Sequence, residues 1–302
     1  MNISEAIEEF LIEQRVRGNS SDTYDYYINC LKYFLNFIGD RDVNDLNLTL
    51  CKSYYLSLCE TKKNSITIQT YVRGVRSFLK WLYLEDKISI DICARFRLPK
   101  CKTKVINVLS DHEVNKIYEV FSGEDFLSKR NKLIISLLLD SGLRLHELVC
   151  ITLGDVNLED RYIIVNGKGD KQRFVPFGSY AASALEDYVK ITFIDLKYHD
   201  SECPLIIKVS APGVFIGITN DTLKDIFRRL KISTGIKRLK CHLLRHTFAT
   251  RFLENGGNIY VLKEILGHTT LKQTQAYLHI ARMRVHRDYG KFSPLDNIKK
   301  PR

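Results

Sequence analysis

Hydrophobic side chains recur every three or four positions along the first 95 residues, the spacing of one face of an α-helix. In residues 65–85 this stripe comprises Ile68, Tyr71, Val72, Val75, Phe78, Leu79 and Leu82. The pattern predicts helices over about 3–17, 21–38, 48–60 and 65–85. Four short amphipathic helices can bury their apolar faces against one another, so residues 1–95 are expected to form a small helical domain.

The pattern changes after residue 95. Residues 95–104 (RFRLPKCKTK) hold five cations and no acid, and Pro99 stops any helix. Residues 96–109 are therefore expected to form a basic linker. Beyond it, helices are predicted over about 111–121, 128–141, 179–190, 220–234, 242–254, 258–266 and 271–285. Two β-branched runs around Gly167-Lys168-Gly169-Asp170 predict a hairpin.

These elements predict a mainly α fold with a small antiparallel β-sheet. The domains are expected to be a four-helix unit over 1–95 and a mixed α/β unit over 110–285, with a tail over 286–302. No apolar run is long enough to span a bilayer, and the acidic N-terminus does not resemble a secretory signal. The eight cysteines show no C-x-x-C or zinc-ligand spacing, so buried reduced thiols and a cytoplasmic location are expected.

Charge is distributed unevenly along the chain. The net charge is +11, and residues 1–99 hold as many acidic as basic side chains, so the whole excess lies in residues 100–302. Such a field attracts polyanions, above all nucleic acid. The charge alone is also compatible with RNA in place of DNA, or with a membrane surface. The expected phosphate contacts are Arg73, Arg76 and Lys80 on one face of the fourth helix, and Lys100, Lys102 and Lys104 in the linker. An ordinary solvated helix face would look the same.

Four local patterns carry candidate chemistry. Gly142 can end a helix, and Arg144 and Glu147 then share a face of the next. Lys168 lies between two glycines at the hairpin tip. His242 and Arg245 project together from one helix, and a guanidinium binds anionic oxygens well. A break at Gly267, followed by a capping-box spacing at Thr270 and Gln273, lets His268 and Tyr277 point into one pocket. Each pattern alone has an ordinary structural explanation.

Together the four patterns resemble the signature of tyrosine site-specific recombinases, which include Xer-type recombinases and phage and transposon integrases. The order Arg144, Lys168, His242, Arg245, His268, Tyr277 matches, within GLRLHEL, HLLRHTFAT and LGHTT. The resemblance covers essentially the whole chain and implies a core-binding domain followed by a catalytic domain that clamp DNA. No arm-binding domain precedes the helices, which argues against the lambda-like subclass.

The resemblance implies that Tyr277 attacks a DNA phosphodiester and forms a 3′-phosphotyrosyl bond, which a partner strand's 5′-hydroxyl later reverses. A tyrosine with a pKa near 10 needs a base, for which His242 is the better candidate, and the 5′-oxygen needs a proton, for which Lys168 is plausible. Arg144 and Arg245 are expected to clamp the non-bridging oxygens, with one hydrogen bond from His268. Glu147 is expected to support this group, and His246 is interpreted as structural because it follows Arg245 directly. No metal or cofactor is expected.

Two alternatives remain at this point, a type IB topoisomerase and a DNA-binding regulator without catalysis. The expected partners are double-stranded DNA with paired recombination sites, a homotetramer of the chain on that DNA, and accessory recombination factors at the nucleoid. By resemblance, the tail with Leu295 and Ile298 is expected to dock on a neighbouring protomer. The target site is not encoded in these patterns, nor is the choice between dimer resolution and movement of an integrative element.

Overall fold

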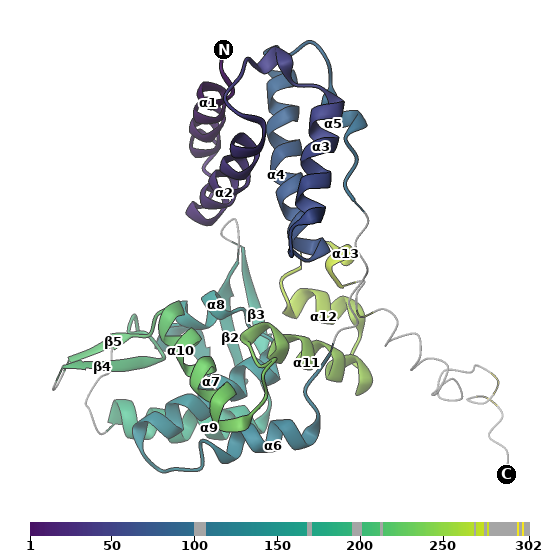
Figure 1. The fold of residues 1–302 in the computed structure, drawn as a ribbon. Helices are drawn as coiled ribbons and strands as arrows, with labels where there is room; N and C mark the ends of the chain where they lie inside the picture. The colour runs from purple at the N-terminus through teal and green to yellow at the C-terminus, as the bar shows by residue number, and fades with distance from the viewer. Residues whose placement is uncertain are drawn as a thin grey trace. The chain divides into compact units, whose positions relative to one another are not determined.

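The computed structural model describes residues 1–99, 107–167, 171–194, 201–211, 214–268, 270–274, 277, 295 and 298. The chain forms two compact units, Met1–Lys104 and Val105–Arg302 (Figure 1). The division falls inside the segment interpreted as a basic linker. The expectation of a mainly α fold with small antiparallel sheets is confirmed.

All the regular elements in the described part of the first unit are helices. Its elements are α1 (Ile3–Val16), α2 (Ser21–Ile38), η1 (Val43–Asp45), α3 (Leu48–Glu60), α4 (Ser65–Leu84) and α5 (Ile92–Arg95). The four long helices confirm the prediction from periodicity to within a residue or two. The single-turn elements η1 and α5 were not predicted, because one turn is too short to show a hydrophobic period.

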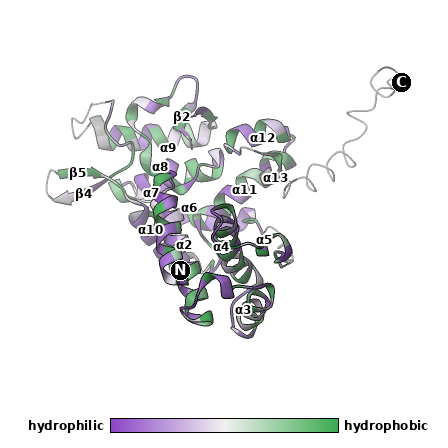
Figure 2. Ribbon diagram, turned by 90° about the horizontal axis from the view of Figure 1, so that it is seen from above, coloured by the Kyte–Doolittle hydropathy of each residue, from purple (hydrophilic) through white to green (hydrophobic). Residues whose placement is uncertain are grey.

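The core of the first unit is built from the predicted apolar stripe. Val72, Val75, Phe78 and Leu82 of α4 are fully buried, and α4 packs against α1, α2 and α3. Figure 2 shows that α3 and α4 each carry hydrophobic and hydrophilic residues along their length. Asn64 caps α4, since its side-chain oxygen accepts a 2.9 Å hydrogen bond from the Thr67 backbone N–H.

The second unit combines helices with two small sheets. Its helices are α6 (Asp111–Glu119), α7 (Phe126–Ser141), α8 (Leu145–Cys150), η2 (Leu153–Asp155), α9 (Ser179–Val189), η3 (Lys190–Ile194), α10 (Asn220–Thr234), α11 (Cys241–Glu254), α12 (Ile259–Ile265) and α13 (Leu271–Thr274). The predicted helices up to residue 266 are all present. For the one predicted over 271–285, only α13 and Tyr277 fall within the described residues.

The predicted hairpin is present and a second one was missed. Strands β1 (Val156–Asn157), β2 (Tyr162–Asn166) and β3 (Gln172–Pro176) form an antiparallel sheet in which Ile164 pairs with Phe174. Strands β4 (Ile207–Ala211) and β5 (Val214–Gly217) form a separate two-stranded sheet. Strand β4 does alternate apolar and polar residues (IKVSA), so its signal was present in the sequence, whereas β5 (VFIG) shows no alternation.

The seven described cysteines are all free thiols, as expected, although Cys59 and Cys150 are exposed rather than buried. Among the described residues, no helix is long and apolar enough to cross a membrane.

One backbone feature places the site within this fold. Helix α7 ends at Gly142, which has φ +63°, a conformation that glycine adopts without strain. A Cβ at this position would lie 2.3 Å from Cδ1 of Phe248 on α11. Only glycine therefore allows the α7–α8 turn to pack directly against α11, which brings Arg144 close to Arg245.

Candidate active site

The predicted pair of Arg144 and Glu147 is present and is built into the start of α8. Arg144 is the N-cap residue, and its backbone N–H donates to Oε2 of Glu147 at 2.8 Å. Its Nη1 donates to Oε1 of Glu147 at 2.7 Å. Glu147 is only 9% exposed, whereas the Arg144 side chain is 38% exposed, so the arginine reaches from the surface to a buried carboxylate and does not form the surface salt bridge that the spacing alone would suggest.

A third residue completes this cluster, and the sequence had not singled it out. Arg173 of β3 donates from Nη2 to Oε2 of Glu147 at 2.7 Å. Burial by itself raises the pKa of the Glu147 carboxyl, but hydrogen bonds from Arg173 and from the Arg144 backbone outweigh it and bring the pKa below its ordinary value. The carboxylate is therefore ionised and joins two arginines that lie 29 positions apart in the sequence.

Arg245 is the most deeply buried cation of the site, with 7% of its surface exposed. Its Nη1 donates to the carbonyl of Gly142 at 2.6 Å, and its Nη2 donates to the carbonyl of Leu266 at 2.7 Å. Burial, reinforced by the charge of Arg144, lowers the pKa of Arg245 to about 10. The guanidinium remains charged at neutral pH, with two backbone oxygens as its acceptors.

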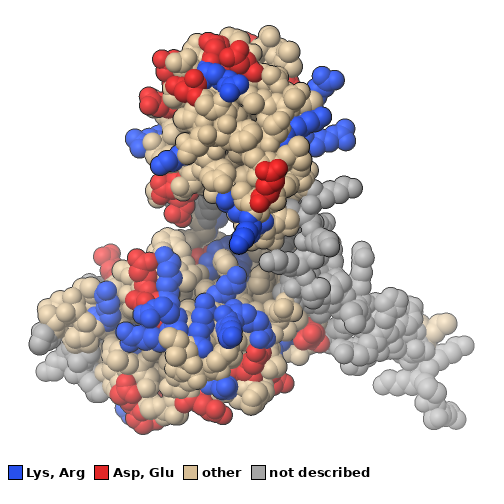
Figure 3. Space-filling model, viewed as in Figure 1, with Lys and Arg blue, Asp and Glu red and all other residues tan. Residues whose placement is uncertain are grey.

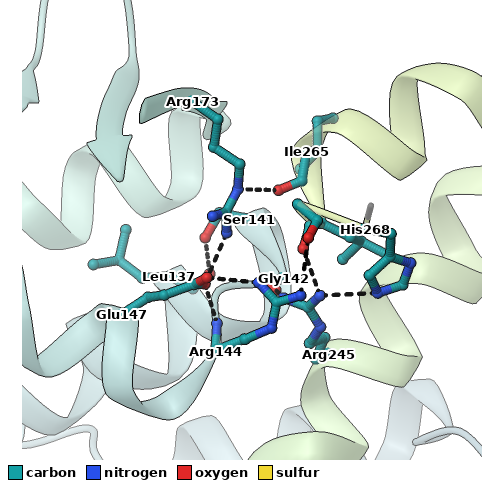
Figure 4. A network of polar contacts seen from close by, with 11 residues as sticks. Leu137, Ser141, Gly142, Arg144, Glu147, Arg173, Arg245, Ile265 and His268 are labelled. Atoms are coloured by element: carbon teal, nitrogen blue, oxygen red, sulfur yellow. Dashed lines mark hydrogen bonds and ion pairs between the residues drawn. The ribbon is translucent and has the colours of Figure 1, made fainter. Parts of the chain in front are cut away.

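The three arginines converge on one turn of the chain, between α12 and α13 (Figure 4). Arg173 Nε binds the carbonyl of Ile265 at 2.8 Å, Arg245 Nη2 binds that of Leu266, and Arg144 Nη2 binds that of Gly267 at 3.1 Å. Three consecutive carbonyls thus each accept from a different guanidinium. We call residues 265–267 the carbonyl turn; His268 follows it directly.

His268 lies between the arginines and α13. A guanidinium has only donors, so Nε2 of His268 accepts from Arg245 Nη2 at 3.2 Å, and Nδ1–H donates to Oγ1 of Thr274 at 3.0 Å. Burial and the nearby charges of Arg245 and Arg144 lower the pKa of His268 to about 4. The ring is neutral at pH 7, and its tautomer is determined by these two contacts.

Tyr277 also contacts helix α11, but its partner there is not His242, the histidine that the sequence favoured as its base. Its side chain is 3% exposed, and its Oη is hydrogen-bonded to Nδ1 of His246. The interpretation that His246 points elsewhere is therefore wrong. Adjacent residues on a helix diverge, but His246 lies four positions after His242, so both project from one face. That spacing was the signal available in the sequence.

His242 is exposed and makes no hydrogen bond to another described residue. Partial burial, together with Arg245 and Lys240, lowers the pKa of His242. Burial likewise lowers the pKa of His246 and raises that of Tyr277 to about 12. In this structure the phenol is thus protonated and shielded, and both histidines are neutral.

Comparison with known proteins identifies the chain. Residues 107–284 match the phage integrase family. Tyrosine recombinase XerD of Oceanobacillus iheyensis is 31% identical over 96% of this chain and 98% of its own. Tyrosine recombinase XerC of Bacillus pumilus is 29% identical over 92% of each chain. The chain belongs to the phage integrase family.

Solved structures of this family have the same fold. The Tn1549 transposon integrase in complex with transposon right end DNA has a TM-score of 0.76 and 20% identity over 96% of this chain and all of that one. A lambda integrase tetramer bound to a Holliday junction has a TM-score of 0.69 and 15% identity, over 89% and 78% of the two chains. The predicted resemblance is confirmed, and the protein is a tyrosine recombinase, an enzyme that breaks and rejoins DNA.

Not every predicted residue of this recombinase can be placed. Lys168, Lys100, Lys102 and Lys104 lie outside the described residues, and so does the side chain of Gln273. Among the described residues, no group of three or more His, Cys, Asp and Glu side chains has the arrangement of a metal site.

The basic row on α4 is partly used within the first unit. Arg76 Nη1 donates to the carbonyl of Cys93 at 2.7 Å, and Lys80 Nζ forms a 2.8 Å ion pair with Asp91. Both contacts hold the short helix α5 against α4. Arg73 is exposed, and among the described residues its side chain has a hydrogen bond only to Gln69, one turn earlier on its own helix. These three cations line one surface hollow together with Arg17, and Arg73 is the one among them without a partner outside α4.

Proposed function

We propose that this enzyme carries out site-specific DNA recombination, such as integration, excision or dimer resolution, through Tyr277. The phenolic oxygen attacks a phosphodiester, forms a 3′-phosphotyrosyl bond and releases a 5′-hydroxyl. The 5′-hydroxyl of a partner strand then attacks that bond and restores the phosphodiester. Each step exchanges one phosphate ester for another, so the reaction consumes no high-energy cofactor.

The convergence of Arg144 and Arg245 on the carbonyl turn is the observation that supports this proposal. Two cations from segments 101 positions apart in the sequence meet within hydrogen-bonding distance of Leu266 and Gly267. Backbone oxygens occupy their donors in this structure. A phosphate oxygen carries a full negative charge and is the stronger acceptor, so the pair is suited to clamping a scissile phosphate and its transition state.

We assign the remaining roles by chemistry. His242 is exposed beside this pair and is the proposed base that takes the proton of Tyr277 as the phenol attacks, while Lys168 is the proposed acid for the 5′-oxygen. His268 is proposed to donate one hydrogen bond to the phosphate. Because its Nε2 accepts from Arg245 in the present structure, donation requires Arg245 to turn toward the phosphate and the ring to adopt its other tautomer. Glu147 orients Arg144.

Phosphate contacts are proposed to supply most of the DNA affinity. On the second unit, Figure 3 shows Lys and Arg side chains gathered on the face that carries α10, a helix with Lys224, Arg228, Arg229 and Lys231. On the first unit, Arg73, Arg76 and Lys80 are proposed, with Arg73 the most available. Lys100, Lys102 and Lys104 of the predicted linker are proposed to add further phosphate contacts to a clamp on the duplex. Such an interface weakens steeply with salt. We propose that the protein acts in the cytoplasm, at the nucleoid.

The covalent intermediate provides the direct test. A duplex with a nick close to the cleavage site loses the short 5′-hydroxyl strand after attack, so the protein stays attached and migrates as a denaturation-resistant adduct. We expect the adduct with the wild-type chain in the presence of a chelator, and not with Tyr277→Phe, while both bind DNA equally. Relaxation of supercoils by a monomer without a preferred site would indicate a type IB topoisomerase instead.

We further propose that the chain assembles as a tetramer on paired sites and that its tail docks on a neighbouring protomer. Leu295 and Ile298 are largely exposed, and the second unit carries a groove of about 490 Å³ lined by side chains that include Phe177, Phe248 and Phe252. Truncation at about residue 288 is expected to abolish tetramers on site DNA in analytical ultracentrifugation. Unchanged tetramers would refute the docking, and accessory factors remain to be sought with the same DNA.

A further inference from the structure

Arg173 makes two contacts that belong to different parts of the site. Its Nη2 binds the buried carboxylate of Glu147 and its Nε binds the carbonyl of Ile265, at 2.7 and 2.8 Å. The side chain is 13% exposed. Because both donors belong to one rigid planar guanidinium, the carboxylate and the turn are held at a set separation.

The backbone of the carbonyl turn packs closely against this guanidinium. Gly267 has φ +61°, and a Cβ there would lie 2.9 Å from Nη1 and 3.0 Å from Cζ of Arg173. The arginine therefore packs directly against the backbone that precedes His268. A Cβ at Gly167 would lie 3.8 Å from the same Nη1, so Arg173 also lies next to the point where β2 leads into the hairpin turn.

Glu147 transmits the position of Arg173 to Arg144. One oxygen, Oε2, accepts from both Arg173 and the Arg144 backbone N–H, while Oε1 accepts from Arg144 Nη1. Without Arg173, the carboxylate would lose one of its three hydrogen bonds, and a buried charge left short of partners would move or draw in water. Either change displaces the Arg144 guanidinium.

We propose that Arg173 is a positioning residue. It fixes the position of the Glu147 carboxylate relative to the carbonyl turn, and so aligns Arg144 and His268 on the scissile phosphate. This inference rests on the proposed function, because it takes these two residues as phosphate ligands. Arg173 itself contacts neither the phosphate nor Tyr277 in this scheme. Its loss should affect the rate of strand cleavage and leave DNA affinity nearly unchanged.

The test compares Arg173→Gln, Arg173→Lys and a matched control. The control is Arg238→Gln, because Arg238 also binds the carboxylate of a capping-box glutamate, Glu113, at 2.6 and 2.7 Å, in the same unit. DNA affinity is measured by fluorescence anisotropy, and cleavage by single-turnover kinetics on the nicked duplex. A second duplex carries a neutral methylphosphonate at the scissile position. Its cleavage should depend less on the cationic side chains, because one charged non-bridging oxygen is replaced by a methyl group.

We expect Arg173→Gln to bind DNA like the wild type and to cleave the phosphate duplex about 100-fold more slowly, the cost of a displacement of about 1 Å in a reacting group. On the methylphosphonate the deficit should be smaller. Arg173→Lys keeps the charge but cannot bind both acceptors, so we expect a cleavage rate between those of the wild type and Arg173→Gln. If Arg173→Gln does not fold, the comparison is made with Arg173→Lys. The effects of Glu147→Gln and Arg173→Gln should be less than additive, because the two residues share one ion pair and both act on Arg144.

Wild-type cleavage by both Arg173 variants would overturn the inference, as would an equal deficit on the two duplexes. So would a loss of the same size in Arg238→Gln, which would indicate general destabilisation. Failure of the wild-type chain itself to form the Tyr277 adduct would instead refute the proposed function.

Discussion

The neutral, half-buried imidazole of His268 should make the second unit sensitive to acid. In the unfolded chain this histidine has its ordinary pKa of 6.5, and in the folded chain the pKa is about 4. Between these values the unfolded chain binds more protons, so stability falls as the pH drops from 6.5 to 4 and is fully present above 6.5. Relative to its value above pH 6.5, the free energy of unfolding is lower by about 2 kcal/mol at pH 5 and by about 3 kcal/mol below pH 4.

His268→Asn removes the titrating ring and keeps an amide near Thr274. We expect the variant to lose about 2 kcal/mol less than the wild type when the pH is lowered from 7 to 5 in urea unfolding. The single tryptophan, Trp81, lies in the first unit, so its fluorescence reports that unit, and circular dichroism adds the transition of the second. His112→Asn, on the surface of α6, is the control. Equal losses in wild type and His268→Asn would refute the reasoning.

Three further predictions concern the packing, the base and the DNA contacts. Gly142→Ala should destabilise the second unit by at least about 2 kcal/mol in urea unfolding, because it adds left-handed strain to a clash with Phe248; an effect below about 0.5 kcal/mol would contradict the tight turn. His242→Ala should slow single-turnover cleavage by about 10²–10⁴-fold, and His246→Ala by less than about tenfold; the reverse order would make the histidine seen on Tyr277 the base. Arg73→Gln should lower the slope of log affinity against log salt by about 0.9, and Lys80→Gln by less because of its ion pair; equal slopes for the two variants would refute this distinction.

The long elements of the fold could be predicted because their apolar faces recur along the sequence. The bounds of α2 and α4 agree with the hydrophobic period, and the hairpin around Lys168 agrees with its glycine turn. The strands β4 and β5 were missed because their signal is short: β4 alternates over only five residues (IKVSA), and β5 is a four-residue run without alternation (VFIG).

The candidate site could be predicted as a set of residue types, but not as a set of contacts. Arg144, Glu147 and Arg245 were found because their motifs are local, and three or four positions on a helix determine which side chains lie together. Arg173 was missed because β-strand position and charge alone do not separate a buried arginine from a solvated one. Its partners, Glu147 and Ile265, are 26 and 92 positions away.

The sequence by itself determined which helices form, where the glycine turns lie and which polar residues stand in the order of a tyrosine recombinase, because each depends on neighbours within a few positions. Only the tertiary structure decided that three arginines bind three consecutive carbonyls and that Tyr277 contacts His246 and not His242. Those contacts depend on how α7, α11 and β3 pack around one turn. Packing joins segments whose separation along the chain carries no periodic signal.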